Sequence, residues 1–302
     1  MKILIAGGTG LVGNHLVDYL INEGHEIRLL TRSIRKLSHT AEQYLWQPDR
    51  GEIDLESLDQ IDVLINLTGS NVGDGRWTTQ KKKEILDSRV QSGQLLFDAV
   101  SQLSTKPSCY ISASGTGAYG IKRFDHLSKE DDPFGTDFLA NVCQEWEAKA
   151  DAFLTLGIRV IKMRLGVVFS PNGGALSKIT QPIRYFVGAP LGSGRQIMPW
   201  IHYLDLNRLI GSWLDDSTKQ GVINAVSPSV VTNAQITQMI AEKIGRPAFL
   251  PNVPGWVLKL LLGEMAEILL AGNIISVDKV LDADFKFEFD RLKPALDDLM
   301  TD

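Results

Sequence analysis

Short apolar runs alternate with longer amphipathic segments over roughly the first 170 residues. The runs have the length and the β-branched content of buried strands, whereas the longer segments carry apolar residues at helical spacing. Strands are predicted at residues 2–6, 26–31, 61–67, 108–114 and 159–169, and helices at 11–22, 79–103 and 137–156. This alternation favours a parallel sheet that is covered by helices on both faces.

Glycine and proline become frequent past Pro171. They surround a predicted helix at 176–187, and further helices are predicted at 233–244, with Thr232 as the N-terminal cap, and at 256–270. We therefore expect an α/β protein, a Rossmann-type doubly wound parallel sheet with a smaller C-terminal α/β substrate lobe. In this prediction residues 1–170 form the Rossmann domain, 195–226 return to it, and 171–194 and 227–302 form the lobe.

Charge and cysteine content exclude several classes of function. The chain of 302 residues has a formal net charge of −5, and its longest run of like charge is Lys81-Lys82-Lys83, so no nucleic-acid partner is expected. Only Cys109 and Cys143 are present, which excludes a disulfide framework and favours a reducing, cytoplasmic location. The histidines lie at no metal-ligand spacing, so no metal site is predicted.

No membrane partner is expected either. The N-terminal apolar run is short and ends in glycines, unlike a signal peptide. The apolar stretch 256–270 is interrupted by Lys259, Glu264 and Glu267 and is too short to span a bilayer. We expect a packed helix or a subunit contact there, in a monomer or a homodimer; binding to a membrane surface has only hydrophobicity in its favour.

The first predicted strand runs directly into a glycine-rich turn. Gly7, Gly10 and Gly13 give the spacing G-x-x-G-x-x-G between a strand and a helix. Gly7 permits the tight turn, Gly10 lets the backbone approach a pyrophosphate, and Gly13 lets the helix pack closely on the strand. The helix start then offers free N–H groups to phosphates. The other residues of this predicted dinucleotide site are Thr9, Leu11 and Val12.

The end of the second strand distinguishes the two nicotinamide dinucleotides. NAD sites usually carry an acidic residue there, which accepts a hydrogen bond from the ribose 2′-hydroxyl. This chain has Thr31, Arg32 and Ser33 instead. Arg32 can pair with a 2′-phosphate and the two hydroxyls can add donors, so NADP is predicted in preference to NAD. The alternative interpretation of Arg32 is a solvated surface arginine.

Motifs along nearly the whole chain belong to one pattern. They are GGTGLVG at 7–13, NLTG at 66–69, SAS at 112–114, YG at 119–120 and WIH at 200–202. In this order they resemble the extended short-chain dehydrogenase/reductase superfamily, and within it the NAD-dependent epimerase/dehydratase family. The segments RWTTQKKKEILDSR and PLGSGRQIMPWIH, with the C-terminal segment, resemble an atypical subfamily labelled sugar-nucleotide epimerase that ends in a domain of unknown function.

The resemblance implies further site residues. In the superfamily the segment 66–69 passes under the adenine and its ribose, and Ser114 corresponds to the serine that bonds the reacting substrate oxygen. If the alignment of the SGTG run is shifted by one, this role falls on Thr116 or Ser112. Another interpretation is that Ser114 is a strand-end serine whose hydroxyl bonds local backbone groups. The further cofactor residues that it implies are Leu67, Thr68, Gly69, Arg89, Ser112 and Ala113.

The chain departs from the superfamily at its catalytic pair, Y-x-x-x-K. Counted back from Glu147, the tyrosine position falls on Leu139 and the lysine position on Cys143. Leucine has no proton to transfer and a neutral thiol supplies no positive charge, so a conventional carbonyl-reductase mechanism is not expected. Tyr119, at the rim of the pocket in the superfamily, is an alternative catalytic residue, and a packing role is its other interpretation.

A second departure concerns the substrate. Nucleotide-sugar members often carry an arginine where this chain has Met198, which disfavours a UDP-sugar. Nearby arginines, including Arg89, can still bind an anionic molecule, and tryptophans suit a flat or apolar one unless they simply pack in the core. The predicted substrate residues are Arg76, Trp77, Arg195, Gln196, Trp200 and His202.

Two functions fit these observations. The first is an NADP(H)-dependent enzyme, epimerase- or reductase-like, that acts on a small molecule with a rebuilt set of proton-transfer groups. The second is a non-catalytic NADP(H)-binding sensor or interaction protein. Leu139 and Cys143 favour the second function, whereas Ser114, Tyr119 and the glycine-rich substrate loop favour the first. We expect the enzyme, with a site between the C-terminal edge of the sheet and the small lobe.

Overall fold

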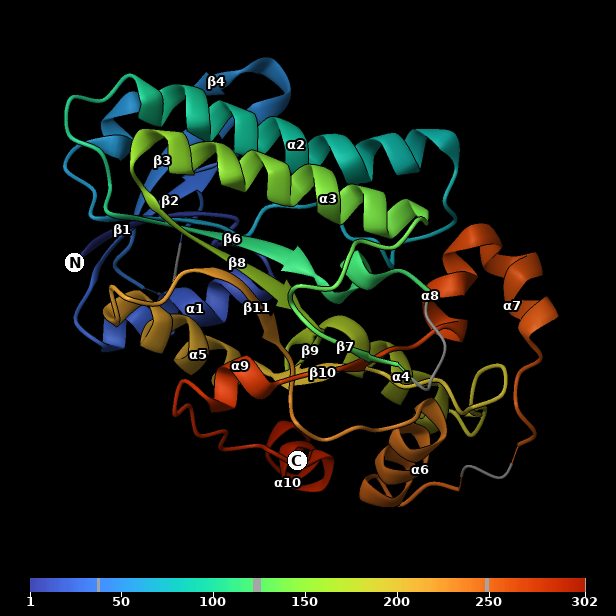
Figure 1. Ribbon diagram of the computed structural model, residues 1–302. Coiled ribbons are helices and arrows are strands. Elements are labelled where there is room, and N and C mark those ends of the chain that lie inside the picture. The colour runs from blue at the N-terminus through green and yellow to red at the C-terminus, as the bar shows by residue number, and fades with distance from the viewer. Residues whose placement is uncertain (37–38, 122–125, 248–249, 302) are drawn as a thin grey trace.

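The computed structural model describes residues 1–36, 39–121, 126–247 and 250–301 (Figure 1). Its centre is an eight-stranded sheet in the order β11-β8-β6-β5-β1-β2-β3-β4. Neighbouring strands are parallel except β3 and β4, which form an antiparallel edge. The strands are β1 (Lys2–Ala6), β2 (Glu26–Thr31), β3 (Glu42–Gln47), β4 (Glu52–Ile53), β5 (Val63–Asn66), β6 (Cys109–Gly115), β8 (Arg159–Leu165) and β11 (Gly221–Ala225).

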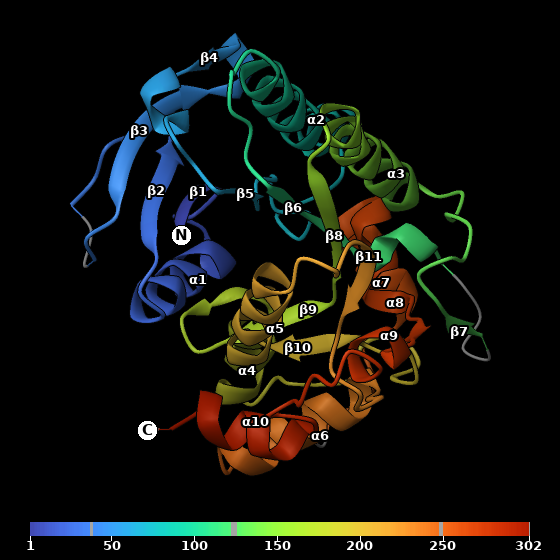
Figure 2. The same ribbon diagram turned by 60° about the vertical axis from the view of Figure 1, so that its left-hand side comes forward.

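Helices cover both faces of this sheet (Figure 2). On one face lie α1 (Leu11–Asn22) and α5 (Tyr203–Asp215), and on the other lie α2 (Thr79–Ser101) and α3 (Phe138–Asp151). Alternate residues of β1 enter the two apolar cores, because successive side chains of a strand point to opposite faces. This arrangement confirms the Rossmann-type doubly wound sheet that the sequence predicts.

The prediction of a single strand at 159–169 is wrong, because the chain leaves the sheet at Gly166. β8 ends one residue earlier, and the chain continues as β9 (Val167–Ser170), which pairs with β10 (Trp200–His202) in a separate two-stranded sheet. A Cβ at position 166 would lie 2.8 Å from the carbonyl oxygen of Pro199, so only glycine allows this close approach.

The C-terminal part of the chain packs around β9 and β10. Thr232 caps α6 in a capping box with Gln235, which confirms the predicted cap. The helix predicted at 176–187 begins and ends earlier, as α4. The elements of this part are α4 (Gly174–Arg184), α6 (Asn233–Lys243), α9 (Asp278–Leu281), α10 (Leu292–Leu299) and β12 (Ile274–Ile275), which pairs in parallel with β7 (Leu127–Ser128) from the first half of the chain.

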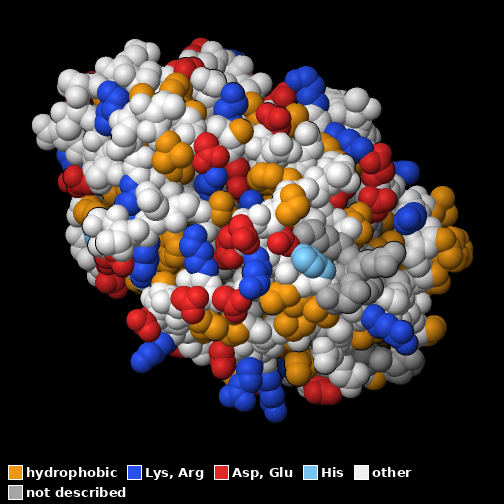
Figure 3. Space-filling model, in the orientation of Figure 1, with side chains coloured by type: hydrophobic (Ala, Val, Ile, Leu, Met, Phe, Trp, Pro, Cys, Tyr) orange, Lys and Arg blue, Asp and Glu red, His pale blue; other side chains and the backbone are white. Residues whose placement is uncertain are grey.

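The apolar stretch predicted as one helix at 256–270 is broken into α7 (Gly255–Leu262) and α8 (Ala266–Leu270). The break falls at Gly263, whose φ of +61° lies in the left-handed region that favours glycine. Trp256, Leu260 and Leu261 on α7 are exposed, and they form an apolar patch at the right-hand edge of Figure 3. No helix within the described ranges is long and apolar enough to cross a membrane.

Candidate functional site

The loop between β1 and α1 depends on glycines at two points of close contact. Gly7 has a φ of +84°, and a Cβ on it would lie 2.9 Å from the carbonyl carbon of Leu67. A Cβ on Gly13 would lie 2.2 Å from the carbonyl oxygen of Gly7, a distance that no side chain tolerates. The loop is therefore pressed against both α1 and the segment that follows β5.

The first turn of α1 has no side-chain cap. Gly10 is the N-cap residue, and the first turn contains no acidic side chain. Thr9 and Gly10 are exposed, while Leu11 and Val12 are half-buried. Backbone N–H groups and the positive end of the helix are thus available to an anion. The glycine cradle and this helix start fit the bridging phosphates of a dinucleotide.

Arg32 lies directly after β2, the strand beside β1, and is exposed. The Thr31 hydroxyl donates to the Ser33 carbonyl oxygen at 2.9 Å and accepts from the Ser33 N–H at 3.3 Å. The Thr31 hydroxyl therefore already donates to the backbone. The exposed Ser33 side chain stands next to Arg32 in the sequence. A guanidinium and a hydroxyl at this edge fit a 2′-phosphate.

The segment after β5 runs along the same edge and is held by its own hydrogen bonds. The Thr68 N–H donates to Asn66 Oδ1 at 3.1 Å, and Thr68 Oγ1 lies 2.7 Å from Ser92 Oγ on α2. Leu67 packs against the core beneath α1, and Gly69 is exposed. The predicted cofactor residues of this segment therefore lie beside the glycine loop.

Arg89 on α2 is buried next to Gly69. Its Nη1 donates to the carbonyl oxygens of Ser70 at 3.1 Å and Ile85 at 2.8 Å. The guanidinium carbon lies 4.8 Å from the centre of the Trp146 ring. Burial lowers the pKa of Arg89 to about 10, so the group stays charged at neutral pH.

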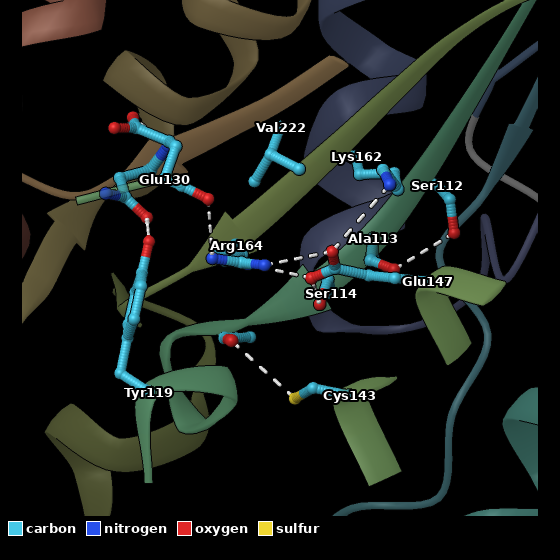
Figure 4. A network of polar contacts seen from close by, with 12 residues as sticks. Ser112, Ala113, Ser114, Tyr119, Glu130, Cys143, Glu147, Lys162, Arg164 and Val222 are labelled. Atoms are coloured by element: carbon cyan, nitrogen blue, oxygen red, sulfur yellow. Dashed lines mark hydrogen bonds and ion pairs between the residues drawn. The ribbon is translucent and has the colours of Figure 1, made fainter. Parts of the chain in front are cut away.

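The end of β6 faces α3 through a buried polar network (Figure 4). Ser114 Oγ donates to Glu147 Oε1 at 2.7 Å. Arg164 holds the same carboxylate with Nε at 2.8 Å and Nη2 at 3.1 Å. All three side chains are 3% exposed, so the Ser114 hydroxyl points into the protein and is already bonded. Ser112 and Ala113, the preceding predicted cofactor residues, are buried as well.

Tyr119 extends this network toward β11. Its hydroxyl donates to Asn224 Oδ1 at 2.5 Å, and its ring centre lies 4.8 Å from the Arg164 guanidinium carbon. Asn224 in turn donates to the Ser276 carbonyl oxygen at 3.1 Å. The Tyr119 side chain has no exposed surface, and burial raises the pKa of Tyr119 to about 12. These surroundings suit a structural tyrosine better than a proton donor at neutral pH.

Leu139 and Cys143 lie on α3 opposite the end of β6. Cys143 Sγ lies 3.6 Å from the Gly115 carbonyl oxygen, and burial raises the pKa of the Cys143 thiol to about 11, so this thiol is neutral at physiological pH. Thr116 follows at the start of the short 3₁₀ helix Thr116–Tyr119 and is half-buried. No hydrogen bond within the described part of the chain involves its hydroxyl.

The six predicted substrate residues divide into two groups. Arg76 and Arg195 are exposed, whereas the other four are buried. Three of the buried side chains bond main-chain oxygens. Trp77 Nε1 donates to Val72 at 2.9 Å, Trp200 Nε1 to Ser229 at 3.2 Å, and Gln196 Nε2 to Leu191 at 2.9 Å and Leu269 at 2.8 Å.

His202 is the fourth buried residue and caps α5. Its Nδ1 accepts from the Leu204 N–H at 3.3 Å, which assigns the ring proton to Nε2, 3.2 Å from Asp298 Oδ2. The ring stacks on Phe289 with centroids 3.8 Å apart. Burial lowers the pKa of His202 to about 4, so the imidazole is neutral at pH 7.

Glu147, Arg164 and Asn224 were not among the residues predicted to form the site. The sequence carries one signal for them, since Arg164 lies at the end of a strand predicted to be central in the sheet, where a buried charge requires a partner. Glu147 and Asn224 become its neighbours only through the packing of α3 and β11 against β8. In the parts of the chain that the structure describes, no group of three or more His, Cys, Asp or Glu residues is placed to hold a metal ion.

The parallel sheet, the glycine loop and the uncapped helix start define a Rossmann-type α/β protein. The chain belongs to the NAD-dependent epimerase/dehydratase family, which matches residues 3–225. Residues 253–299 match a domain of unknown function, DUF1731. These matches confirm the family that the sequence motifs suggest and the match of its C-terminal segment to a domain of unknown function.

Known proteins are similar to the chain over its whole length. Epimerase family protein SDR39U1 of Mus musculus is 35% identical over 99% of this chain and 100% of its own, and epimerase family protein YfhF of Bacillus subtilis is 31% identical over 100% and 99%. A crystal structure of human SDR39U1 (isoform 2) with NADPH covers 99% of both chains at 31% identity, with a TM-score of 0.88. UDP-glucose 4-epimerase of Thermotoga maritima covers 98% of both chains at 17% identity, with a TM-score of 0.79, and shares the fold.

Proposed function

We propose that this protein binds NADP(H) at the edge of the sheet formed by the ends of β1, β2, β5 and β6. The observation that carries the proposal is the glycine cradle at Gly7 and Gly13 together with the uncapped first turn of α1, on the strand edge that also carries the exposed Arg32. The similarity to a protein crystallised with NADPH supports it. The residues assigned to the cofactor are Gly7, Thr9, Gly10, Leu11, Val12, Gly13, Thr31, Arg32, Ser33, Leu67, Thr68, Gly69, Arg89, Ser112 and Ala113.

Titration with NADPH and NADH tests the cofactor assignment. Arg32→Ala is expected to weaken NADPH binding about tenfold or more and to leave NADH binding nearly unchanged, because only NADPH carries the 2′-phosphate. Arg291→Ala is the matched control, since the Arg291 side chain is 78% exposed. Equal losses for the two dinucleotides would assign Arg32 no role in reading the 2′-phosphate. A wild-type protein that binds neither dinucleotide would refute the proposal.

The reaction proposed is epimerase- or reductase-like hydride chemistry on a small molecule. A bound nicotinamide supplies the hydride chemistry, and the residues of the chain bind and orient the substrate and hold its proton. Thr116 is the better candidate for a hydroxyl that contacts substrate, since the Ser114 and Tyr119 hydroxyls are bonded to Glu147 and Asn224. Ser114 and Tyr119 then position the end of β6.

The substrate proposed is anionic, because the predicted substrate residues that remain exposed are Arg76 and Arg195. We assign its binding to the lobe formed by residues 171–194 and 227–302, which carries α4, α6 and α7. Arg76 reaches this lobe, since a Cβ on Gly263 would lie 3.4 Å from Arg76 Nε. Gln196, Trp200 and His202 lie in the segment 195–226 and contact the lobe at Leu191, Ser229 and Phe289.

A second candidate function is a non-catalytic NADP(H) sensor, which the burial of Ser114, Tyr119 and Cys143 favours. A panel of ketones, quinones and nucleotide sugars incubated with NADPH separates the two functions. Turnover that Thr116→Val reduces at least about 100-fold, with NADPH affinity retained, would support the enzyme. NADPH binding without turnover of any compound would favour the sensor.

A further inference from the structure

We propose that the substrate is a quinone whose apolar ring packs on Leu139 and whose anionic substituent lies at Arg76. This inference rests on the proposed NADP(H) binding and on the reductase form of the proposed reaction, and it names the substrate class. Two features of the end of β6 carry it, namely the weakness of the proton donors there and the apolar side chains that surround them.

The polar side chains at the end of β6 are weak acids or are already bonded (Figure 4). Burial raises the pKa of the Cys143 thiol to about 11 and the pKa of the Tyr119 hydroxyl to about 12. The Ser114 hydroxyl donates to Glu147, and this carboxylate is ion-paired with Arg164. None of these groups is a good proton donor at neutral pH.

A carbonyl compound that is reduced without an acid must carry the negative charge itself. A simple ketone becomes an alkoxide, which is about as basic as hydroxide, and the pKa of water is about 15.7. A quinone becomes a hydroquinone monoanion, which is a phenolate, and the pKa of a phenol is about 10. The anion of the quinone product is therefore more accessible by a factor of about 10⁵. A site that lacks an acid suits a quinone better than a ketone or a sugar.

The balanced reaction is quinone plus NADPH plus one proton to hydroquinone plus NADP⁺. The quinone gains a hydride, one hydrogen with its electron pair from the C–H bond that breaks in NADPH, and becomes the hydroquinone monoanion. Water supplies the proton that neutralises the phenolate oxygen. Thr116, whose hydroxyl has no hydrogen bond within the described part of the chain, donates a hydrogen bond to this oxygen and keeps its own proton.

Leu139, which occupies the position of the superfamily's tyrosine, belongs to an apolar cluster beside the end of β6. A Cβ on Gly117 would lie 3.2 Å from Leu139 Cβ, so the two elements touch. Trp77 and Phe138 of the same cluster meet edge to face, with ring centres 5.0 Å apart. Leu139 is half-buried and keeps apolar surface for a ligand. A sugar on this surface would leave hydroxyl groups without hydrogen-bond partners, which is costly, whereas an apolar ring would not.

The apolar cluster ends beside Arg76. Leu262 is one of its half-buried members, and a Cβ on the next residue, Gly263, would lie 3.4 Å from Arg76 Nε and 3.5 Å from Nη2. Arg76 is exposed and forms no ion pair with another described residue. A guanidinium without a partner at the edge of an apolar surface fits an anionic group on the ring.

Naphthalene-2-sulfonate tests the binding part of the proposal without turnover, because it has a flat ring and an anionic group but no reducible carbonyl. It is titrated by calorimetry into protein saturated with NADPH. Leu139→Asn is expected to weaken its binding about tenfold or more through lost apolar contact, and Arg76→Gln about tenfold through the lost charge. Both variants are expected to keep NADPH affinity within about twofold of wild type.

The control variants are Leu154→Asn and Arg291→Gln, because the Leu154 residue is 52% exposed and the Arg291 side chain is 78% exposed. Wild-type protein that does not bind naphthalene-2-sulfonate would overturn the proposal, and so would wild-type affinity in Leu139→Asn. Exposed Arg76 covers the case in which Leu139→Asn does not fold, since unchanged affinity in Arg76→Gln would also overturn it.

NADPH oxidation by 1,4-naphthoquinone-2-sulfonate, corrected for the rate without protein, tests the substrate class. Its kcat is expected to exceed that of any simple ketone at least about 100-fold, and no epimerisation of a nucleotide sugar is expected. A ketone that reacts as fast as the quinone, an epimerised nucleotide sugar, or NADPH binding without quinone turnover would overturn the proposal. Wild-type protein that binds no NADPH would refute the proposed function instead.

The pH profile of quinone turnover shows whether an acid of the protein takes part. At saturating NADPH and quinone, kcat is expected to stay within about twofold between about pH 6.5 and 8.5. The pKa values of Arg89, Cys143 and Tyr119, about 10, 11 and 12, lie above this range, and Glu147 and Arg164 are paired with each other. A tenfold change in kcat over this range would reveal a titrating proton donor and would overturn the proposal.

Discussion

The glycine loop after β1 and the polar network at the end of β6 lie at the same edge of one sheet but use their polar groups in opposite ways. In the loop, the first turn of α1 is uncapped and Arg32 is exposed. In the network, Ser114, Glu147 and Arg164 are buried and bonded to one another. Donors without a partner in the protein are available to a ligand, whereas polar groups that are bonded to one another stabilise the fold. The partners of a side chain, and not its type, therefore distinguish a ligand-binding residue from a structural one.

The largest expected effect comes from removing the centre of the network. Glu147→Ala leaves Arg164 buried without its carboxylate, which is expected to cost about 3–5 kcal/mol in the free energy of unfolding. Urea denaturation measures this loss. Glu145→Ala, an exposed glutamate on the same helix, is the control and is expected to cost less than about 0.5 kcal/mol. A loss below about 1 kcal/mol for Glu147→Ala would show that the network does not hold the fold together.

The corresponding change in the loop is expected to act on binding. Gly13→Ala places a methyl group 2.2 Å from the Gly7 carbonyl oxygen, so the loop must move away from the helix start. NADPH affinity is expected to fall about 100-fold or more, since several backbone bonds to phosphate are lost together. Gly255→Ala is the control, because its Cβ lies 3.4 Å from Leu270 in an ordinary contact. A folded Gly13→Ala protein with wild-type affinity would show that phosphates bind elsewhere.

Buried His202 makes stability depend on pH. Its folded pKa of about 4 lies below the unfolded value of 6.5, so the unfolded chain takes up a proton first as the pH falls. The stabilising contribution is full above pH 6.5 and is lost between pH 6.5 and 4, which amounts to about 2 kcal/mol between pH 7 and 5. Urea denaturation at the two pH values is expected to show this loss in wild-type protein and a smaller one in His202→Asn. Equal losses in both proteins would assign the pH dependence to other groups.

The sequence predicts the parts of the fold that are buried on both faces. The runs that become β1 and β5 are apolar and continuous, and each is followed in the chain by a predicted helix. Strands β3, β4, β10 and β11 were not predicted, because partly exposed or very short segments give a weak pattern. Helix α5, with 13 residues, was not predicted either. The break in 159–169 depends on contact with Pro199, which is distant in sequence, so local periodicity does not reveal it.

The candidate site shows the same difference between features set by local sequence and features set by contacts that are distant in sequence. The glycine spacing indicates a local turn, so the loop after β1 is predictable from residues 7–13 alone. The surroundings of Ser114 are set by α3 and β8, more than 30 positions further along the chain, and Tyr119 meets Asn224 across 105 positions. A hydroxyl in a motif gives no information about whether such a partner satisfies it, which is why the choice between Ser114 and Thr116, both open from the sequence, depends on the structure.

The smallest expected effect distinguishes Ser114 from a substrate-binding serine. Ser114→Ala removes one donor from Glu147 Oε1, but Arg164 Nε still donates to the same oxygen at 2.8 Å, so the carboxylate stays paired. The expected cost is about 1 kcal/mol in the free energy of unfolding, with NADPH affinity within about twofold of wild type. Ser217→Ala, at an exposed loop position, is the control. If Ser114→Ala left stability unchanged and abolished turnover, the hydroxyl would belong to the substrate site, and the contrast between the loop and the network would fail at this residue.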